Sequence, residues 1–217
     1  TKRVPRFLSG FAVSVGSSTP PSGSKAPHFS VADVTKSETV TVSDKITAVE
    51  AGESSARRRR LAGFETYDIR RVREWVVAHN RIRHMHSPLP PLLWDPALAR
   101  FAQAHADSVG ANAQCRPEAN EAAGEAGLGE VYLWAAVEKG VALFTAAEAV
   151  QAWAEQGKHY SSSTGACVQG AECDAFIQLT WRDTRRVGCG EALCPYKANF
   201  TGVAQFLVCN YYPPAAL

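Results

Sequence analysis

The residues of this chain that could do chemistry include six cysteines and six histidines. Consecutive cysteines are 52, 6, 16, 5 and 15 residues apart. This spacing lacks the paired Cys-x-x-Cys or Cys/His clusters of a zinc site. We therefore expect disulfide bonds, formed in an oxidising compartment.

The histidines do not form a recognisable ligand set. His84 and His86 stand in a segment closed by three prolines, where they could touch a metal but lack a third ligand. His79 lies at the apolar edge of a predicted helix, and we interpret it as a hydrogen-bonded structural residue. Nothing in the sequence brings His105 or His159 to a shared site. The chain also lacks a His-Glu-x-x-His motif, a Gly-x-Ser-x-Gly motif and a phosphate-binding glycine loop.

Three helices are predicted to position these residues. Apolar residues recurring at steps of three and four from Tyr67 predict the first helix. Asp95 as N-cap and Pro96 at the first helical position begin the second helix, which Gly110 ends. A third helix begins at about Thr145.

The segment from Cys173 to Cys209 should form the sheet. It contains three short apolar and aromatic runs, at 176–181, 187–193 and 206–208, separated by glycine or polar clusters. Such runs are typical of strands packed on a core. Four of the six cysteines fall inside this segment.

Two stretches of this segment resemble signatures of the CAP superfamily, which unites cysteine-rich secretory proteins, venom antigen 5 and plant pathogenesis-related class 1 proteins. The first resembles the plant version and reads Trp181-Arg182-Asp183-Thr184, then Arg186-Val187-Gly188-Cys189 and Cys194; the second reads Val208-Cys209-Asn210-Tyr211. The opening of the family domain is matched by His79-Asn80-x-x-Arg83 and Pro91-Leu92-Leu93-Trp94-Asp95.

The resemblance covers about residues 67–214 and implies a fold of the α+β class. The expected architecture is a three-layer α-β-α sandwich with a central antiparallel sheet. Helices between 67 and 156 would form the outer layers, and strands between Cys173 and Cys209 the sheet. The resemblance also implies a disulfide pairing by cysteine order, which leaves no free thiol as a nucleophile. The pairs are Cys115 with Cys194, Cys167 with Cys173, and Cys189 with Cys209.

Family members commonly hold two His and two Glu in a central cleft, which in some of them binds a divalent metal. This sequence departs from that pattern, with Ala175 at one His position and Gln156 at one Glu position. The other His precedes a Gly-Glu pair by five residues, and two registers are open, Asn120 with Glu125 or Glu125 with Glu130. Neither register supplies a His, and carboxylates alone would hold calcium or magnesium only if several oxygens converged. We expect no metal, no cofactor and no catalytic residue.

Residues 1–60 are predicted to be a disordered tail or pro-segment, and residues 61–217 the folded domain. Residues 16–56 are rich in small and polar residues and carry too little apolar surface to fold. Residues 7–15 could be the remnant of a signal peptide. Arg57–Arg60 is either a solvated charge run or a processing site cleaved after Arg60. The tail carries the basic charge, so nucleic-acid binding is not expected.

The expected protein is secreted, monomeric and glycosylated at Asn199 of an Asn-Phe-Thr sequon. No window reaches the roughly 18 apolar residues of a membrane span. The resemblance implies a non-enzymatic protein that binds a sterol or fatty acid and acts in defence or at a host or microbe surface. One alternative is a metal-dependent hydrolase, which Ala175 disfavours. Another is a protein-interaction module whose loops at 84–91 and 110–129 contact a partner.

Overall fold

The computed structural model describes residues 68–86, 89–112, 116–138, 141–196 and 202–216, without the side chain of Tyr196. The elements belong to one compact unit that takes in residues 70–217. Four predictions fall outside the described residues: the tail with its possible cleavage after Arg60, the possible signal-peptide remnant at 7–15, the sequon at Asn199, and Cys115 with its pairing.

Four strands form the main sheet, in the order β1-β5-β6-β2. They are β1 (Leu93–Trp94), β2 (Gly129–Glu138), β5 (Arg186–Tyr196) and β6 (Gly202–Tyr212). The three long strands pair antiparallel, and the two-residue β1 adds a parallel pair along β5, so the sheet is mixed at this edge. A separate short ladder joins β3 (Tyr160–Ser161) to β4 (Ala166–Cys167).

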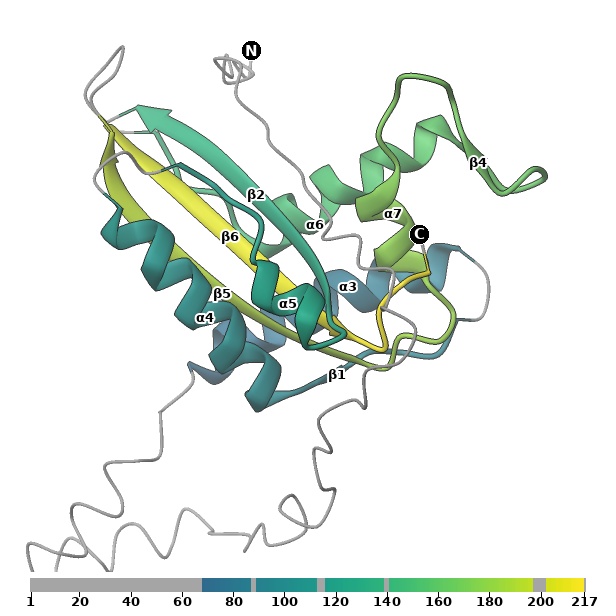
Figure 1. Ribbon diagram of the computed structural model, residues 1–217, viewed down its shortest axis with the longest axis horizontal. Coiled ribbons are helices and arrows are strands. Elements are labelled where there is room, and N and C mark those ends of the chain that lie inside the picture. The colour runs from purple at the N-terminus through teal and green to yellow at the C-terminus, as the bar shows by residue number, and fades with distance from the viewer. Residues whose placement is uncertain (1–67, 87–88, 113–115, 139–140, 197–201, 217) are drawn as a thin grey trace, which may run out of the picture. The chain divides into compact units, whose positions relative to one another are not determined.

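Helices cover both faces of the main sheet (Figure 1). They are α3 (Ile69–Met85), α4 (Pro96–Ala111), α5 (Glu121–Glu125), α6 (Ala146–Ala154), the 3-10 helix η2 (Glu155–His159) and α7 (Asp174–Thr180). The helix α4 packs on one face, and α3, α6 and α7 pack on the other. None of the described helices combines the length and apolar character needed to cross a bilayer.

Side chains that alternate along β6 separate the two cores, as the strand period of two requires. Phe206 and Val208 pack against α4, whereas Leu207 and Tyr211 pack in the larger core on the opposite face. In the larger core the rings of Trp75 and Trp153 stack, with centroids 6.1 Å apart. The predicted three-layer α-β-α class is therefore confirmed.

The predicted caps explain where two helices begin. The side chain of Asp95 accepts hydrogen bonds from the backbone N–H groups of Ala97 and Leu98, and Pro96 occupies the first turn of α4. At the start of α6, Thr145 and Glu148 form a capping box in which each side chain accepts from the other residue's backbone. The second helix runs one residue past the predicted end at Gly110, to Ala111.

Two segments differ from prediction. The run at 176–181, predicted as a strand, lies largely in α7, where Ala175, Phe176, Gln178 and Leu179 are buried. This spacing of one, three and four residues is the pattern of a helix face rather than of a strand. Conversely, residues 129–138, for which the sequence predicted neither a helix nor a strand, form the edge strand β2. It is apolar on both faces because both are covered, so it lacks the alternation of a half-exposed strand.

Candidate functional site

A hydrogen bond at the start of α7 joins Gln156 and Ala175, two of the four cleft positions. The backbone N–H of Ala175 donates a hydrogen bond of 2.9 Å to Gln156 Oε1. This N–H lies in the first turn of α7, where Cys173 makes no side-chain cap. Gln156 thus satisfies a helix N-terminus that would otherwise lack an acceptor. Because the Ala175 side chain has no donor atom for a metal, the pair stabilises a helix and offers no ligand set.

Glu130 is a cleft position in one of the two open registers, and hydrogen bonds hold both oxygens of its carboxyl. It lies near the start of β2, with 1% of its surface exposed. Its Oε1 accepts from the backbone N–H of Asn120 at 2.9 Å, and its Oε2 accepts from Asn210 Nδ2 at 3.1 Å. Burial raises the pKa of Glu130, while the Asn120 N–H, His105 and Asn210 oppose that rise. Both oxygens of the carboxyl are already engaged.

His105 lies beside Glu130, which the sequence did not predict. Its Nε2 is 3.9 Å from Glu130 Oε1 and 2.9 Å from the carbonyl oxygen of Glu118. Since a carbonyl only accepts, Nε2–H donates to Glu118 and offers no lone pair to a metal. The ring also packs edge-on against Phe206. The one signal in the sequence for this contact is that His105 lies on the apolar face of the second predicted helix.

The structure does not bring the cleft positions into one ligand set. Glu125 is exposed at the end of α5, and Asn120 occupies the N-cap position of α5 without a side-chain cap. Glu130 contacts α4, whereas Ala175 packs in the core on the opposite face of the sheet. Within the described ranges, the one group of three or more His, Cys, Asp or Glu close enough to share a metal contains none of these positions.

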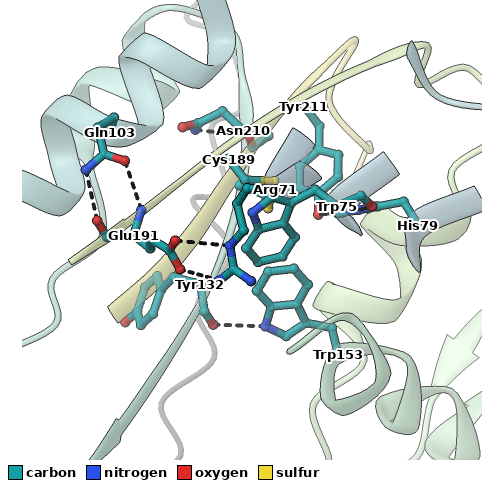
Figure 2. The surroundings of a disulfide bond; sticks show 12 residues. Arg71, Trp75, His79, Gln103, Tyr132, Trp153, Cys189, Glu191, Asn210 and Tyr211 are labelled. Atoms are coloured by element: carbon teal, nitrogen blue, oxygen red, sulfur yellow. Dashed lines mark hydrogen bonds and ion pairs between the residues drawn. A yellow bond between two sulfur atoms is a disulfide. The ribbon is translucent and has the colours of Figure 1, made fainter. Parts of the chain in front are cut away.

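His79 has the structural role that was predicted. It is fully buried, with Nδ1 2.8 Å from the carbonyl oxygen of Trp75 and Nε2 2.8 Å from the Tyr211 hydroxyl. The Trp75 carbonyl can only accept, so Nδ1 carries the hydrogen and the Tyr211 O–H donates to Nε2. Burial, opposed by the hydrogen bond to Trp75 and assisted by the charge of nearby Arg83, lowers the pKa of His79 to about 4. Figure 2 shows Trp75, His79 and Tyr211 around the Cys189–Cys209 disulfide.

Arg83 and Asn80 complete the motif that begins at His79. The buried guanidinium of Arg83 donates to four carbonyl oxygens, those of Pro90, Leu179, Trp181 and Thr184, at 2.9 to 3.3 Å. Burial, together with the charge of nearby Arg185, lowers the pKa of Arg83 to about 10. The Asn80 side chain pairs with the backbone N–H and C=O of Leu92. The motif therefore fastens α3 to the segment just before β1 and to the segment between α7 and β5.

Arg71 extends this anchoring to β5. Its guanidinium donates to both carboxylate oxygens of Glu191 and lies 5.5 Å from the ring centre of Trp75. On the other side of β5, the Gln103 carboxamide exchanges two hydrogen bonds with the backbone of Glu191 (Figure 2). Gln103 thereby supplies the edge of β5 with the partner that a neighbouring strand would provide.

Two of the implied disulfides lie within the described chain, Cys167–Cys173 and Cys189–Cys209. Cys194 is also disulfide-bonded. His84, predicted in a loop, falls in the last turn of α3, and His86 follows the helix and packs edge-on against Phe176. Both histidines are exposed.

This chain and its curated relatives have identical residues at about a third of the aligned positions. The chain is 30% identical to pathogenesis-related protein 1C of Nicotiana tabacum over 141 residues, covering 65% of this chain and 74% of the relative. It is 31% identical to glioma pathogenesis-related protein 1 of Mus musculus, covering 65% of this chain and 52% of the relative. It is 33% identical to human peptidase inhibitor 16, covering 64% of this chain and 28% of that longer protein.

Solved structures with similar folds include the venom allergen-like protein 4 of Schistosoma mansoni, with 22% identity, a TM-score of 0.46, and coverage of 65% of this chain and 87% of that one. MpPR-1i is similar at 21% identity and a TM-score of 0.47, over 69% of this chain and 92% of the other. Residues 76–211 match the model of the CAP family, described as the cysteine-rich secretory protein family. This chain belongs to the CAP family of cysteine-rich secretory proteins.

Proposed function

We propose that this chain is a secreted, non-enzymatic CAP-domain protein of the pathogenesis-related class 1 type, which acts by binding. The observation that carries the proposal is the hydrogen bond from Ala175 N–H to Gln156 Oε1. At two positions where family members present metal ligands, this chain uses a carboxamide to cap a helix. A catalytic metal site needs several protein ligands and an open coordination position.

The surroundings of Glu130 support the same proposal. A catalytic carboxylate must present an oxygen to a metal or a substrate, but both oxygens of Glu130 accept hydrogen bonds from Asn120 and Asn210. His105 directs its Nε2–H to Glu118. Each of these groups holds the chain between α4 and β2 in place.

The ligand we propose is a sterol or a fatty acid, as the family resemblance implies, with a role in defence or at a host or microbe surface. Trp75 and Trp153 are buried and stacked in the core, which leaves no role for them in contacting such a ligand. Trp134 and Trp181 are half-buried and could contact it. A ligand held by apolar area should bind almost equally at low and high salt.

The test is saturable binding of radiolabelled cholesterol and of palmitate to the full chain with its disulfides intact. Binding that changes little with salt supports the proposal. Absence of saturable binding to either lipid would instead favour a protein-interaction module that uses the loops at 84–91 and 110–129. Hydrolysis that depends on an added metal, and that is lost in Glu130→Gln, would restore the hydrolase alternative.

Maturation is a further part of the proposal. We propose removal of residues 1–60 by cleavage after Arg60, a glycan at Asn199, and a disulfide between Cys115 and Cys194. A mass spectrum of the secreted protein under non-reducing conditions would measure all three. Recovery of the intact tail from the culture medium would overturn the cleavage.

A further inference from the structure

Three potential metal ligands from three separate elements meet in the larger core. A ring nitrogen of His79 on α3 and the sulfurs of Cys189 on β5 and Cys209 on β6 lie within 4.8 Å of one another. The sheet register places the two cysteines directly opposite each other. The exposed fractions of these residues are 0%, 7% and 0%, so water has little access.

We propose that reduction of the Cys189–Cys209 disulfide creates a buried zinc site formed by the two thiolates and His79. A dithiol reductant would supply two electrons and two protons, break the S–S bond to give two thiols, and itself become a disulfide. A phosphine gives the same two thiols: it supplies the two electrons, water supplies the two protons, and the phosphine becomes its oxide. Binding of Zn²⁺ would then release both thiol protons. Reoxidation would remove two electrons from the thiolates, re-form the S–S bond and expel the zinc.

The spacing of the donors suits zinc. In tetrahedral zinc, Zn–S bonds of about 2.3 Å and Zn–N bonds of about 2.0 Å place neighbouring donor atoms roughly 3.5 to 3.8 Å apart. The two thiolates and His79 would fill three of the four positions. The three donors already lie within 4.8 Å. Once the S–S bond is broken, the two sulfurs must move apart by roughly 1.7 Å to reach the spacing of zinc-bound thiolates.

The hydrogen bonds of His79 already fix the tautomer that a zinc ligand needs. Its Nδ1–H donates to the Trp75 carbonyl, the arrangement that commonly fixes the tautomer of a metal-binding histidine. The lone pair of Nε2 accepts from the Tyr211 hydroxyl, so Tyr211 is the group that zinc must displace.

Charge balance favours zinc over a monovalent ion. Two thiolates and a neutral imidazole around Zn²⁺ carry no net charge, whereas the same ligands around Cu⁺ would leave one negative charge in the core. An unbalanced charge is costly in a buried apolar site. The surrounding Trp75, Trp153 and Leu207 provide such a site.

The other described disulfide is an internal control. Cys167 is half-buried in β4, and Cys173 lies just before α7. Among the residues that the structure describes, no third His, Cys, Asp or Glu lies close enough to complete a metal site with them. Reduction converts each disulfide to two thiols, but only the Cys189–Cys209 pair has an imidazole beside it, that of His79.

The experiment reduces the full chain with tris(2-carboxyethyl)phosphine, adds one equivalent of Zn²⁺ or none, and follows alkylation of each cysteine by mass spectrometry. Zinc should slow alkylation of Cys189 and Cys209 by at least about tenfold, and leave Cys167 and Cys173 unchanged. Circular dichroism of the same samples reports whether the reduced chain keeps its fold. The oxidised chain should show no response to zinc.

Two variants test the role of the imidazole. Tyr211→Phe removes the competing hydrogen-bond donor and keeps all three ligands, so protection should be kept or increased. The variant His79→Gln should lose the zinc-dependent protection of Cys189 and Cys209 from alkylation. Equal protection of all four cysteines, protection in a chain that has lost its fold, full protection in His79→Gln, or no protection at all would each overturn the proposed site. Because lipid binding is measured on the oxidised chain, these outcomes leave the proposed function unaffected.

Discussion

The His79-Asn80-x-x-Arg83 motif and the cleft pair of Gln156 and Ala175 are both places where the family resemblance assigns polar residues a role. In the motif the expected residues are present, and every one is tied to backbone or to a neighbouring hydroxyl. In the cleft the expected ligands are replaced, and the remaining amide caps a helix. The contrast indicates that the motif joins separate segments of the fold, whereas Gln156 and Ala175 join only the start of α7 to η2.

The largest effect should come from removing the cation of the motif. Arg83→Met would leave four carbonyl oxygens, two of them in buried hydrogen bonds, without their donor, and we expect a loss of about 3 to 5 kcal/mol in the free energy of unfolding. Arg81→Met, at an exposed position on the same helix, is the control and should change stability by less than about 0.5 kcal/mol. Urea unfolding measures both, and similar losses in the two variants would refute the role assigned to Arg83.

The next effect is the pH dependence that His79 imposes. Its pKa is about 4 in the folded protein and 6.5 ordinarily, so the unfolded chain binds more protons between these values. Stability should therefore fall as the pH drops from 6.5 towards 4, by up to about 3 kcal/mol. Glu130 acts in the opposite direction, because its raised pKa makes the folded state bind protons more tightly at acidic pH.

His79→Phe isolates this contribution. The variant should be less stable at neutral pH, because the Tyr211 hydroxyl loses its acceptor, but its stability should fall less on acidification. Unfolding free energies at about pH 7 and about pH 4.5 provide the comparison. Identical slopes for the variant and the parent chain would show that another group controls the acid sensitivity.

A smaller effect is expected in the cleft. Gln156→Ala removes the acceptor at the start of α7 and should cost about 1 kcal/mol, as loss of a helix cap typically does. Gln156→Glu keeps an oxygen at the same position and should retain most of the stability. Glu155→Ala, at the exposed neighbouring residue, is the matched control. A loss in Glu155→Ala equal to that in Gln156→Ala would argue against the cap.

The elements that the sequence predicted well have local signals. Asp95 and Pro96 specify the start of α4 through backbone geometry and one side chain, without help from distant residues. The predicted runs at 187–193 and 206–208 lie within β5 and β6. The segment of α7 was misassigned because its aromatic and apolar content suggests a strand, although the positions of its buried residues follow a helical pattern.

The site was harder to predict because its contacts depend on sheet register. Glu130 meets Asn210 because β2 and β6 pair these residues, and His105 reaches Glu130 because α4 lies on that face. No local pattern encodes either contact. The replacement of cleft ligands by Ala175 and Gln156 was visible in the sequence, but the hydrogen bond between them required the packing of η2 against α7.

The most direct test of the account is calorimetric titration of the oxidised, untagged full chain with Zn²⁺ and Cu²⁺ at neutral pH. We predict no metal site with a Kd below about 10 μM. The variant Ala175→His alone should not restore metal binding, since one imidazole still lacks partner ligands. A tight isotherm with one metal per chain, abolished by Glu130→Gln, would contradict the account.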